Sequence, residues 1–327
     1  MKKIIYLYRH AGQFYSIEKV FSTVKEYCND QYQIEDANVP CSGANIIAII
    51  RNLVHAWKLR NSNIHITGDI HYIIFALKRN KCVLTIHDVR LLHLLKGLKR
   101  LLFLYFWIKL PIFYAKYITC ISETTKEELI NITKVSPNKI TVIPNPINDE
   151  FTYIEHDFED KCPVILHVGT MENKNLERVC IALKSIQCQL IIIGKLSVKQ
   201  KQILSSLSLQ YINKYDISDH DMVKEFIHAD IISFPSLAEG FGMPIIQGQA
   251  VGRAVLTSDR EPMKGIAGIN GAELVNPEDT VSIRNAFLRI IHDSNHRNNL
   301  IKNGLINIKR FSGKNIFAQY SQIYNKF

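Results

Sequence analysis

The sequence predicts an α/β protein built from two domains, each with a parallel sheet covered by helices. Two observations carry this prediction. The 327 residues are enough for two domains of about 150 residues each. Short apolar runs alternate with helix-length segments along both halves of the chain. Such alternation is typical of parallel strands that are buried on both faces.

The first half contains five runs that are predicted to be buried strands. Each run is short, apolar and bounded by polar or turn-forming residues. The runs are KKIIYLY, NIHIT, CVLTI, YITCI and KITVI. Helix-length segments at 16–28 and 43–60 lie among them, so this half predicts one Rossmann-like domain.

The second half repeats the scheme. Its predicted strands are PVILHVG, QLIIIG, LQYI, DIISF and AVLTS. Helices are predicted at 175–186, at 198–208 and after Glu239. Residues 143–163 separate the halves, because three prolines, several acids and no hydrophobic period mark a linker. Two such domains are expected to face a cleft, where strand ends and helix N-termini collect ligands.

Composition favours a globular protein with an anionic partner. Apolar residues make up 47% and charged residues 21% of the chain, which is ordinary for a folded protein. The net charge of +10 and the pI near 9.1 suit nucleic acid, an acidic membrane surface or a phosphorylated small molecule. A lysine-rich surface without a specific partner is the alternative.

Seven cysteines are scattered without a Cys-x-x-Cys pair. This favours reduced core thiols in a cytoplasmic protein over disulfides or a zinc site. The N-terminal MKKIIYLYRHAG has an apolar run too short for a signal peptide. The longest apolar run, at 101–115, is interrupted by Lys109 and Pro111 and is too short to span a membrane.

Residues 90–110 are predicted to form one basic amphipathic helix. On a helical wheel, seven apolar side chains share one face: Leu91, Leu94, Leu95, Leu98, Leu101, Leu102 and Tyr105. Four basic side chains lie opposite them: His93, Lys96, Lys99 and Arg100. This pattern, with Trp107 nearby, is typical of contact with an anionic membrane surface. Packing of the helix on its own sheet is the alternative.

The stretch SLAEGFGMPIIQGQAVG at 236–252 carries the clearest chemical signal. It follows a predicted strand and opens a helix with Pro244 in the first turn, where a missing N–H costs nothing. The amides there form an anion site that flanking glycines let a phosphate approach. Since a phosphate repels a carboxylate, we expect Glu239 to accept hydrogen bonds from sugar hydroxyls. Gln247 lies on the same helix and could bind more hydroxyls. A helix cap at Glu239 and a solvated Gln247 are the alternative.

These residues resemble the E-x7-E region of retaining family-4 glycosyltransferases of GT-B fold. In that family the first Glu and the following Gly-Phe-Gly engage the donor sugar and phosphates. The resemblance implies donor-binding roles here for Glu239, Gly240, Phe241, Gly242 and Met243. The second Glu usually holds the ribose, and its position is Gln247 here. An amide can accept a hydroxyl proton, but it lacks the charge-assisted bond of a carboxylate.

Further segments share the resemblance, which covers nearly the whole chain. LHVGTMENKNLERVC at 166–180 is similar to the strand and loop that supply a Lys to the donor diphosphate. This implies donor-binding roles for Gly169, Thr170, Asn173 and Lys174. The Arg usual beside that Lys is absent, so Lys174 is expected to carry most of the charge neutralisation.

Matches in other loops add four positions. His87, at the end of the run CVLTI, matches a family His that faces the donor sugar. Gly12 would let the loop RHAGQFY approach the phosphates. Base contacts are expected near Tyr215 and Ile217.

The resemblance implies that residues 1–150 bind the acceptor and residues 151–310 bind the nucleotide sugar. Residues 311–327 are expected to form a helix that packs back on the N-terminal domain. The implied reaction moves a sugar, with retained anomeric configuration, from a nucleotide diphosphate to a glycan or lipid-linked acceptor. The implied setting is bacterial polysaccharide synthesis of the O-antigen or capsule type, on the inner face of the cell membrane.

The catalytic residues implied are His87, Lys174 and Glu239. Lys174 and the helix amides would stabilise the leaving diphosphate, and a donor phosphate oxygen would take the acceptor proton. No metal or other cofactor is expected. The Asp-x-Asp at 219–221 follows Ser218 and is interpreted as a helix cap.

Several alternatives stay open. Other GT-B activities, such as a sugar-nucleotide epimerase or a phosphorylase, share the fold. A catalytically weak sugar-nucleotide-binding partner subunit is suggested by Gln247. A nicotinamide oxidoreductase is not favoured, because no Gly-x-Gly-x-x-Gly follows the first strand. A nucleic-acid-binding protein is not favoured either, because no recognition motif is present.

Overall fold

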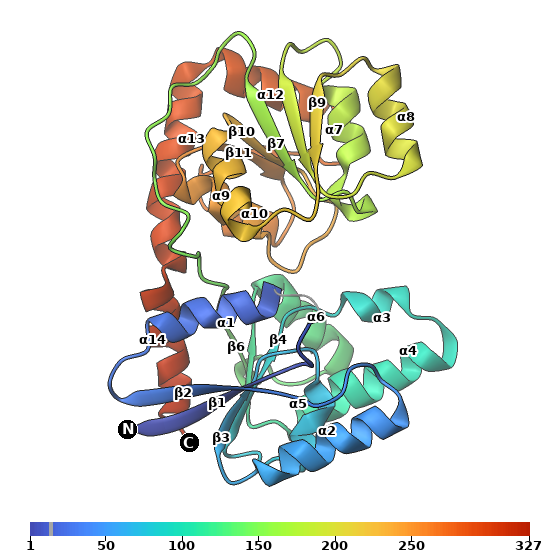
Figure 1. Cartoon of the computed structure of the whole chain (residues 1–327), viewed down its shortest axis with the longest axis vertical. Helices are drawn as coiled ribbons and strands as arrows, with labels where there is room; N and C mark the ends of the chain where they lie inside the picture. The colour runs from blue at the N-terminus through green and yellow to red at the C-terminus, as the bar shows by residue number, and fades with distance from the viewer. Residues whose placement is uncertain (13–15) are drawn as a thin grey trace. The chain divides into compact units, whose positions relative to one another are not determined.

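The structure is a computed structural model that describes residues 1–12 and 16–327. The chain forms two compact units (Figure 1). Unit 1 comprises Met1–Pro146 and Ser312–Phe327, and unit 2 comprises Ile147–Phe311. Each unit contains a six-stranded parallel sheet, so the predicted α/β class with two parallel sheets is confirmed.

The sheet of unit 1 has the strand order β2-β1-β3-β4-β5-β6. Its strands are β1 Lys2–Tyr8, β2 Tyr32–Asn38, β3 Asn63–Ile66, β4 Cys82–Ile86, β5 Tyr117–Cys120 and β6 Ile140–Val142. All five predicted strands of this half are present. The edge strand β2 was not predicted, because its sequence YQIEDAN buries only alternate residues at its start.

Helices cover both faces of this sheet. They are α1 Ser16–Glu26, α2 Ile46–Lys58, η1 His71–Ala76, α3 Arg90–Leu94, α4 Gly97–Phe103, η2 Leu104–Lys109, α5 Leu110–Tyr114, α6 Glu123–Thr133, η3 Pro137–Lys139 and α14 Gly313–Tyr324. Alternation along β1 separates two cores. Ile4 and Tyr6 pack with α1 and α14, whereas Ile5 and Leu7 pack with α2, η1 and α5.

The C-terminal helix α14 belongs to unit 1 and is joined to its sheet by buried hydrogen bonds. The Tyr324 hydroxyl donates to Tyr6 Oη at 3.1 Å and therefore accepts from His65 Nδ1 at 2.7 Å. The Thr85 hydroxyl then donates to His65 Nε2 at 2.6 Å. Burial lowers the pKa of His65 to about 3, so this ring is neutral.

The single helix predicted for residues 90–110 is wrong. The chain is extended at Leu95 and Lys96, with ψ of 148° and 159°, and this interrupts the segment between α3 and α4. After α4 the helix widens into the π-helix η2. Pro111 has no N–H to donate, and Trp107 O accepts instead from His71 Nδ1 of η1 at 2.8 Å. In the described part of the chain, no helix is both long and apolar enough to cross a membrane.

The sheet of unit 2 has the order β12-β11-β10-β7-β8-β9. Its strands are β7 Val164–Val168, β8 Gln189–Ile193, β9 Tyr211–Lys214, β10 Ile231–Phe234, β11 Ala254–Ser258 and β12 Glu273–Val275. The five predicted strands are present, and only the three-residue β12 was missed. The chain starts at the central β7, proceeds to β9 and returns to β10, so the topological switch point lies between β7 and β10.

The helices of unit 2 are η4 Glu172–Lys174, α7 Leu176–Ala182, α8 Val198–Ser206, α9 Asp219–His228, α10 Met243–Ala250, α11 Met263–Ala267, α12 Thr280–His292, α13 Ser294–Asn307 and η5 Ile308–Phe311. The linker before β7 contains no helix or strand. The buried carboxylate of Asp230 holds its end by accepting from His156 Nε2 at 2.7 Å and from the Val164 amide at 2.7 Å.

Candidate active site

The loops that follow β7 and β10 meet at the switch point of unit 2. The Leu237 amide donates to Asn173 O at 2.7 Å. Asn173 Nδ2 donates to Ala238 O at 3.0 Å and to Glu239 Oε1 at 3.2 Å. The two segments in which the sequence predicted donor contacts are therefore joined directly.

The central contact is an ion pair between Lys174 and Glu239. Lys174 Nζ lies 2.6 Å from Glu239 Oε1, and the two side chains are only 16% and 8% exposed. The ammonium also lies 4.8 Å from the centroid of the Phe234 ring, within the range of a cation–π contact. The cation and the carboxylate singled out in separate motifs form one charge pair.

Gly169 makes room for this lysine. Its φ of 98° is in the left-handed region, and an added Cβ would lie 2.7 Å from Lys174 Cγ. A side chain at this position would therefore collide with the lysine stem and strain the backbone. Glycine is required here by both conformation and space.

Thr170 is hydrogen-bonded to the loop and the helix that follow β8. Its hydroxyl donates to Lys195 O at 2.8 Å, and its carbonyl accepts from Gln200 Nε2 at 2.8 Å. Gly194 follows β8 with φ of 134°, and an added Cβ would lie 2.9 Å from the Thr170 side chain. Thr170 therefore joins the loops after β7 and β8.

Helix α10 begins beside the ion pair. Gly242 is its N-cap with φ of 114°, and Pro244 lies in the first turn, as predicted. Pro244 has no N–H and the Ile245 amide donates to Gly242 O at 3.0 Å, so among the first three residues of α10 the Met243 amide remains for an anion at this N-terminus. Phe241 is 4% exposed and packs edge-on against Phe311 at 5.8 Å between centroids, so its ring belongs to the core of unit 2. Met243 is half-buried.

Two glutamines on α10 differ in their surroundings. Gln249 is buried, donates to Ala267 O at 2.8 Å and Gly271 O at 2.9 Å, and accepts from Asn307 Nδ2 at 2.8 Å. Gln247 is half-buried. Only Gln247 therefore offers its amide at a partly exposed position of this helix.

Tyr215 and Ile217 lie in the loop after β9, at the same edge of the sheet as the ion pair but two strands from β7. Tyr215 is 55% exposed, and Ile217 is half-buried. The residues predicted to bind the base therefore lie two strands away from those predicted to bind the phosphates.

The remaining predicted residues belong to unit 1. His87 follows β4, and its Nε2 donates to Thr67 O at 2.8 Å. Because a carbonyl only accepts, Nε2 carries the hydrogen and Nδ1 is the acceptor of the neutral ring. Gly12 has φ of 89°, and no atom of the described residues would lie within 4 Å of a Cβ added there. The rest of its loop, residues 13–15, lies outside the described residues.

Two neighbours of the ion pair were not singled out in the sequence. Asn175, buried with φ of 66°, donates to Pro235 O at 3.0 Å and to Pro277 O at 2.6 Å, which joins the loops after β7, β10 and β12. His167 is buried in β7, and burial and the nearby Lys174 lower its pKa to about 3. A histidine inside an apolar run carries no sequence signal that distinguishes it from the core.

The Asp-x-Asp at 219–221 forms the expected helix cap. Ser218 Oγ accepts from the Asp221 amide at 3.1 Å, and its hydroxyl donates to Asp221 Oδ2 at 2.7 Å. Within residues 1–12 and 16–327, no three His, Cys, Asp or Glu side chains gather as a metal-binding group.

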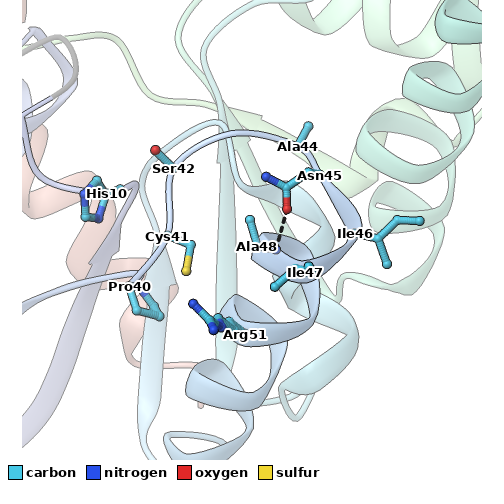
Figure 2. Close-up of a pocket in the computed structure, with 10 residues that line it drawn as sticks. All are labelled: His10, Pro40, Cys41, Ser42, Ala44, Asn45, Ile46, Ile47, Ala48 and Arg51. Carbon is cyan, nitrogen blue, oxygen red and sulfur yellow. Dashed lines mark hydrogen bonds between the residues drawn. The ribbon is translucent and has the colours of Figure 1, made fainter.

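A separate open hollow of about 1030 Å³ lies in unit 1, after β1 and β2 and at the start of α2 (Figure 2). It is lined by His10, Pro40, Cys41, Ser42, Ala44, Asn45, Ile46, Ile47, Ala48 and Arg51. Asn45 caps α2 by accepting from the Ala48 amide at 2.8 Å. Figure 2 shows His10 and Ile46 on opposite sides of the hollow. The sequence did not predict these residues.

Two family models match the chain. The model described as Glycosyltransferase Family 4 matches residues 36–151, and the model described as Glycosyl transferases group 1 matches residues 149–305. The matches therefore cover most of unit 1 and nearly all of unit 2.

Individual proteins are similar to this chain over most or all of its length. An uncharacterised glycosyltransferase of Methanocaldococcus jannaschii is 28% identical over 298 residues, which are 85% of this chain and 81% of that protein. The O-antigen chain mannosyltransferase RfbU of Salmonella typhimurium is 27% identical over 222 residues, 65% of this chain and 62% of RfbU. A crystal structure of Anabaena HepE in complex with UDP and glucose covers 100% of both chains with a TM-score of 0.80 at 14% identity, which shows a common fold.

Proposed function

The chain belongs to the family-4, or group 1, glycosyltransferases, and from that premise we propose that it moves a sugar from a nucleotide-diphosphate sugar to a glycan or lipid-linked acceptor, with retained anomeric configuration. The acceptor is part of a bacterial cell-surface polysaccharide of the O-antigen or capsule type. The similarity to RfbU supports the acceptor class. The UDP and glucose bound to the structurally similar HepE support the donor class.

The Lys174–Glu239 pair beside the N-terminus of α10 carries this proposal. An ammonium has three donors, of which one lies on Glu239 Oε1. The others are available to the donor diphosphate, together with the Met243 amide at the start of α10. The carboxylate retains acceptor positions for sugar hydroxyls. One buried pair can thus bind both halves of a nucleotide sugar.

Charge development accounts for catalysis at this site. Negative charge accumulates on the diphosphate as its bond to the anomeric carbon breaks. Lys174 and the N-terminus of α10 are fixed before the reaction, so they stabilise that charge without reorganisation. A phosphate oxygen takes the proton of the acceptor hydroxyl, which attacks from the side that the diphosphate leaves. We propose that this arrangement needs no metal ion.

Unit 1 supplies the acceptor side in this proposal. His87 offers Nδ1 to a sugar hydroxyl in this proposal, because its Nε2 is bound to Thr67 O. The hollow of Figure 2 receives the acceptor. The cationic Arg51 and the polar His10 suit an anionic group, and the exposed Ile46 suits a hydrocarbon part.

Contact of residues 90–110 with the inner face of the cell membrane remains part of the proposal. Lys96, Lys99 and Arg100 are exposed, and replacing all three by Glu should abolish binding to anionic vesicles. Unaltered sedimentation of the variant with such vesicles would exclude the contact.

The deciding experiment is thermal stabilisation by UDP, GDP, ADP and dTDP and their sugar conjugates. We expect one nucleotide family to stabilise the protein. Lys174→Ala should weaken that nucleotide about 10- to 100-fold, since a charge-assisted hydrogen bond contributes about 1.5–3 kcal/mol. Lys199→Ala is the matched control, because Lys199 is an exposed lysine of unit 2 paired with Glu177 at 2.7 Å.

The outcome separates the proposal from its alternatives. Unchanged affinity in Lys174→Ala would move the phosphate site elsewhere. No stabilisation by any nucleotide would favour the partner-subunit alternative that Gln247 suggests. Release of an epimer without an acceptor, or consumption of inorganic phosphate, would identify an epimerase or a phosphorylase.

A further inference from the structure

The side chain of Asn173 lies between the loops that follow β7 and β10, next to the ion pair. Asn173 is the middle residue of the short helix η4 and immediately precedes Lys174. Its backbone is bound to the other loop, because the Leu237 amide donates to Asn173 O at 2.7 Å. The sequence predicted that Asn173 binds the donor directly, but its contacts in the structure indicate a different role.

Both hydrogens of the Asn173 side-chain amide are used within unit 2. Nδ2 donates to Ala238 O at 3.0 Å and to Glu239 Oε1 at 3.2 Å. The orientation of the amide follows from its partners, because a carbonyl and a carboxylate only accept and must therefore face the nitrogen. Since an amide nitrogen carries two hydrogens, each contact takes one of them. The side chain has no further hydrogen to donate.

This arrangement leaves Asn173 without a hydrogen bond for the donor diphosphate. The remaining polar atom of its side chain is Oδ1, which only accepts. Phosphate oxygens also accept, so Oδ1 would repel them. Lys174 Nζ, by contrast, uses one of its three hydrogens on Glu239 and keeps the others for a phosphate. The two neighbouring residues of η4 are therefore suited to different tasks.

The two oxygens of the Glu239 carboxylate have different surroundings. Oε1 accepts from Lys174 Nζ at 2.6 Å and from Asn173 Nδ2 at 3.2 Å. Within residues 1–12 and 16–327, no group donates to Oε2, and this oxygen is not completely buried. Oε2 is therefore the oxygen that can accept from a hydroxyl group of a ligand.

Two donors on one oxygen restrict the rotation of the carboxylate. The last torsion of a glutamate has a broad, roughly two-fold preference, and an ammonium is a compact charge on a flexible stem. Lys174 alone could therefore pair with either oxygen. Asn173 removes this freedom, because the same amide also holds Ala238 O, the carbonyl that directly precedes Glu239. One amide thus fixes both the backbone before Glu239 and the orientation of its carboxylate.

We propose that Asn173 is a positioning residue that presents Glu239 Oε2 to a hydroxyl group of the donor sugar. The inference rests on the proposed function and deepens it, because it assigns the oxygen that binds the sugar and the residue that orients this oxygen. Asn173 itself contacts neither the sugar nor the diphosphate. A carboxylate that is held before binding needs no reordering when the sugar arrives. Loss of Asn173 should therefore weaken the contact with the sugar and leave the contact with the diphosphate intact.

The test compares the affinity for a nucleoside diphosphate with the affinity for its sugar conjugate. The probes are UDP and UDP-glucose, GDP and GDP-mannose, ADP and ADP-glucose, and dTDP and dTDP-glucose, each measured by isothermal titration. In Asn173→Ala, the affinity for the conjugate should fall about tenfold, the effect of one hydrogen bond to a charged group. The affinity for the nucleoside diphosphate should change by less than about twofold. Lys174→Ala should weaken both, so one experiment separates the two roles.

Asn307→Ala is the matched control for a loss of stability. Asn307 Nδ2 donates to Gln249 Oε1 at 2.8 Å and to Ile266 O at 2.8 Å, so it also joins a side-chain oxygen and a backbone carbonyl of unit 2. Because Asn307 is buried, its loss should lower the melting temperature at least as much as Asn173→Ala. Both affinities should stay unchanged in this control. A tenfold weaker conjugate in Asn307→Ala as well would overturn the proposal.

A double-mutant cycle determines whether Asn173 acts through Glu239. In the Glu239→Gln background, Asn173→Ala should have no further effect on the affinity for the conjugate, because the charge that it orients is absent. Multiplied effects of the two substitutions would overturn the proposal. An unchanged affinity for the conjugate in Asn173→Ala, or a loss of diphosphate affinity as large as in Lys174→Ala, would do the same.

The outcome also distinguishes this inference from the proposed function. If the unaltered chain binds none of the four nucleotides or their conjugates, the proposed function fails and the role of Asn173 fails with it. If the unaltered chain binds one nucleotide family and only the results for the Asn173 variants contradict the expectation, the positioning role is wrong and the proposed function stands.

Discussion

Units 1 and 2 share a six-stranded parallel sheet but arrange their charged side chains in opposite ways. In unit 2, Lys174 lies 2.6 Å from Glu239 and Lys214 lies 2.6 Å from Glu225. In residues 37–122 of unit 1, no lysine or arginine forms an ion pair with any carboxylate of the described residues. The cations of that stretch instead border exposed apolar side chains.

The contrast indicates two kinds of anionic partner. A buried charge pair has one geometry, and it selects a small ligand that can satisfy both charges at once. Solvated cations around an apolar surface have no single geometry, and they suit an extended, fluid surface whose charges can rearrange. Unit 2 thus resembles a ligand site, and unit 1 a docking surface. The predictions below test the two sides of this comparison in order of expected effect.

The largest effect is expected from Glu239→Gln in unit 2. The amide oxygen can still accept from Lys174 and Asn173, so the melting temperature should fall by only a few degrees. Loss of the charge should lower sugar transfer by about 100-fold or more, the effect of removing one preorganised electrostatic group. Steady-state transfer and thermal unfolding measure the two quantities.

Glu261→Gln is the matched control for this prediction. Glu261 is another glutamate of a loop after a unit 2 strand, and its carboxylate accepts from the Gly265 amide at 3.1 Å. It should leave transfer unchanged. Equal activity of Glu239→Gln and the control would show that the buried pair is structural only.

The second prediction concerns a property that the units share. His65 in unit 1 and His167 in unit 2 each have a pKa lowered from 6.5 to about 3 by burial. Between about pH 6.5 and pH 3, the two histidines are therefore protonated in the unfolded chain but neutral in the folded chain. Stability should fall as pH falls through that range, by up to about 1.4 kcal/mol per pH unit for each histidine.

Denaturant unfolding at pH 7, 6 and 5 measures this slope. His167→Asn replaces the ring by a smaller polar amide that does not titrate, and it should remove the contribution of His167 to the pH dependence of stability. A slope that is the same in the variant and the unaltered chain would contradict the assignment of His167 as a neutral buried group.

The third prediction compares one glycine from each unit. Gly169 and Gly97 both have positive φ, 98° and 56°. A Cβ at Gly169 would meet Lys174 Cγ at 2.7 Å, whereas a Cβ at Gly97 would meet nothing within 4 Å. Gly169→Ala should therefore cost about 1 kcal/mol more stability than Gly97→Ala. It should also weaken nucleotide binding, and equal effects of the two variants on both quantities would contradict a space requirement at Lys174.

Sequence patterns predicted the sheets well, because buried parallel strands are short apolar runs wherever they occur. They missed the edge strand β2, which is half polar, and β12, which has three residues. They failed at 90–110. The helical wheel assumed one continuous helix through Leu95, Lys96 and Gly97, whereas the backbone is extended at Leu95 and Lys96.

Side-chain environments were less accessible from sequence than strands. The motifs predicted that Lys174 and Glu239 both bind the donor, but not that they contact each other. The sequence predicted a helix-length segment at 43–60, but not which of its apolar side chains are buried. Only packing decides which side of such a helix is covered, and here Asn52 is buried and binds Tyr72, whereas Ile46, Ile47 and Ile50 are exposed.

The smallest effect is expected at Gln247, and it sharpens the description of unit 2. Gln247 is half-buried on α10, eight residues after Glu239, and it stands where the family usually has a second glutamate. Gln247→Glu should replace a neutral hydrogen bond to the ribose by a charge-assisted one. The gain in nucleotide affinity should be less than about tenfold, since a carboxylate gives about 1.4 kcal/mol at most over an amide at a partly solvated position. Isothermal titration with the stabilising nucleotide measures it, and Gln210→Glu, an exposed glutamine before β9, controls for the added charge. A weaker affinity in Gln247→Glu alone would mean that this position faces a phosphate rather than the ribose, and the donor would then lie along α10 in the opposite direction.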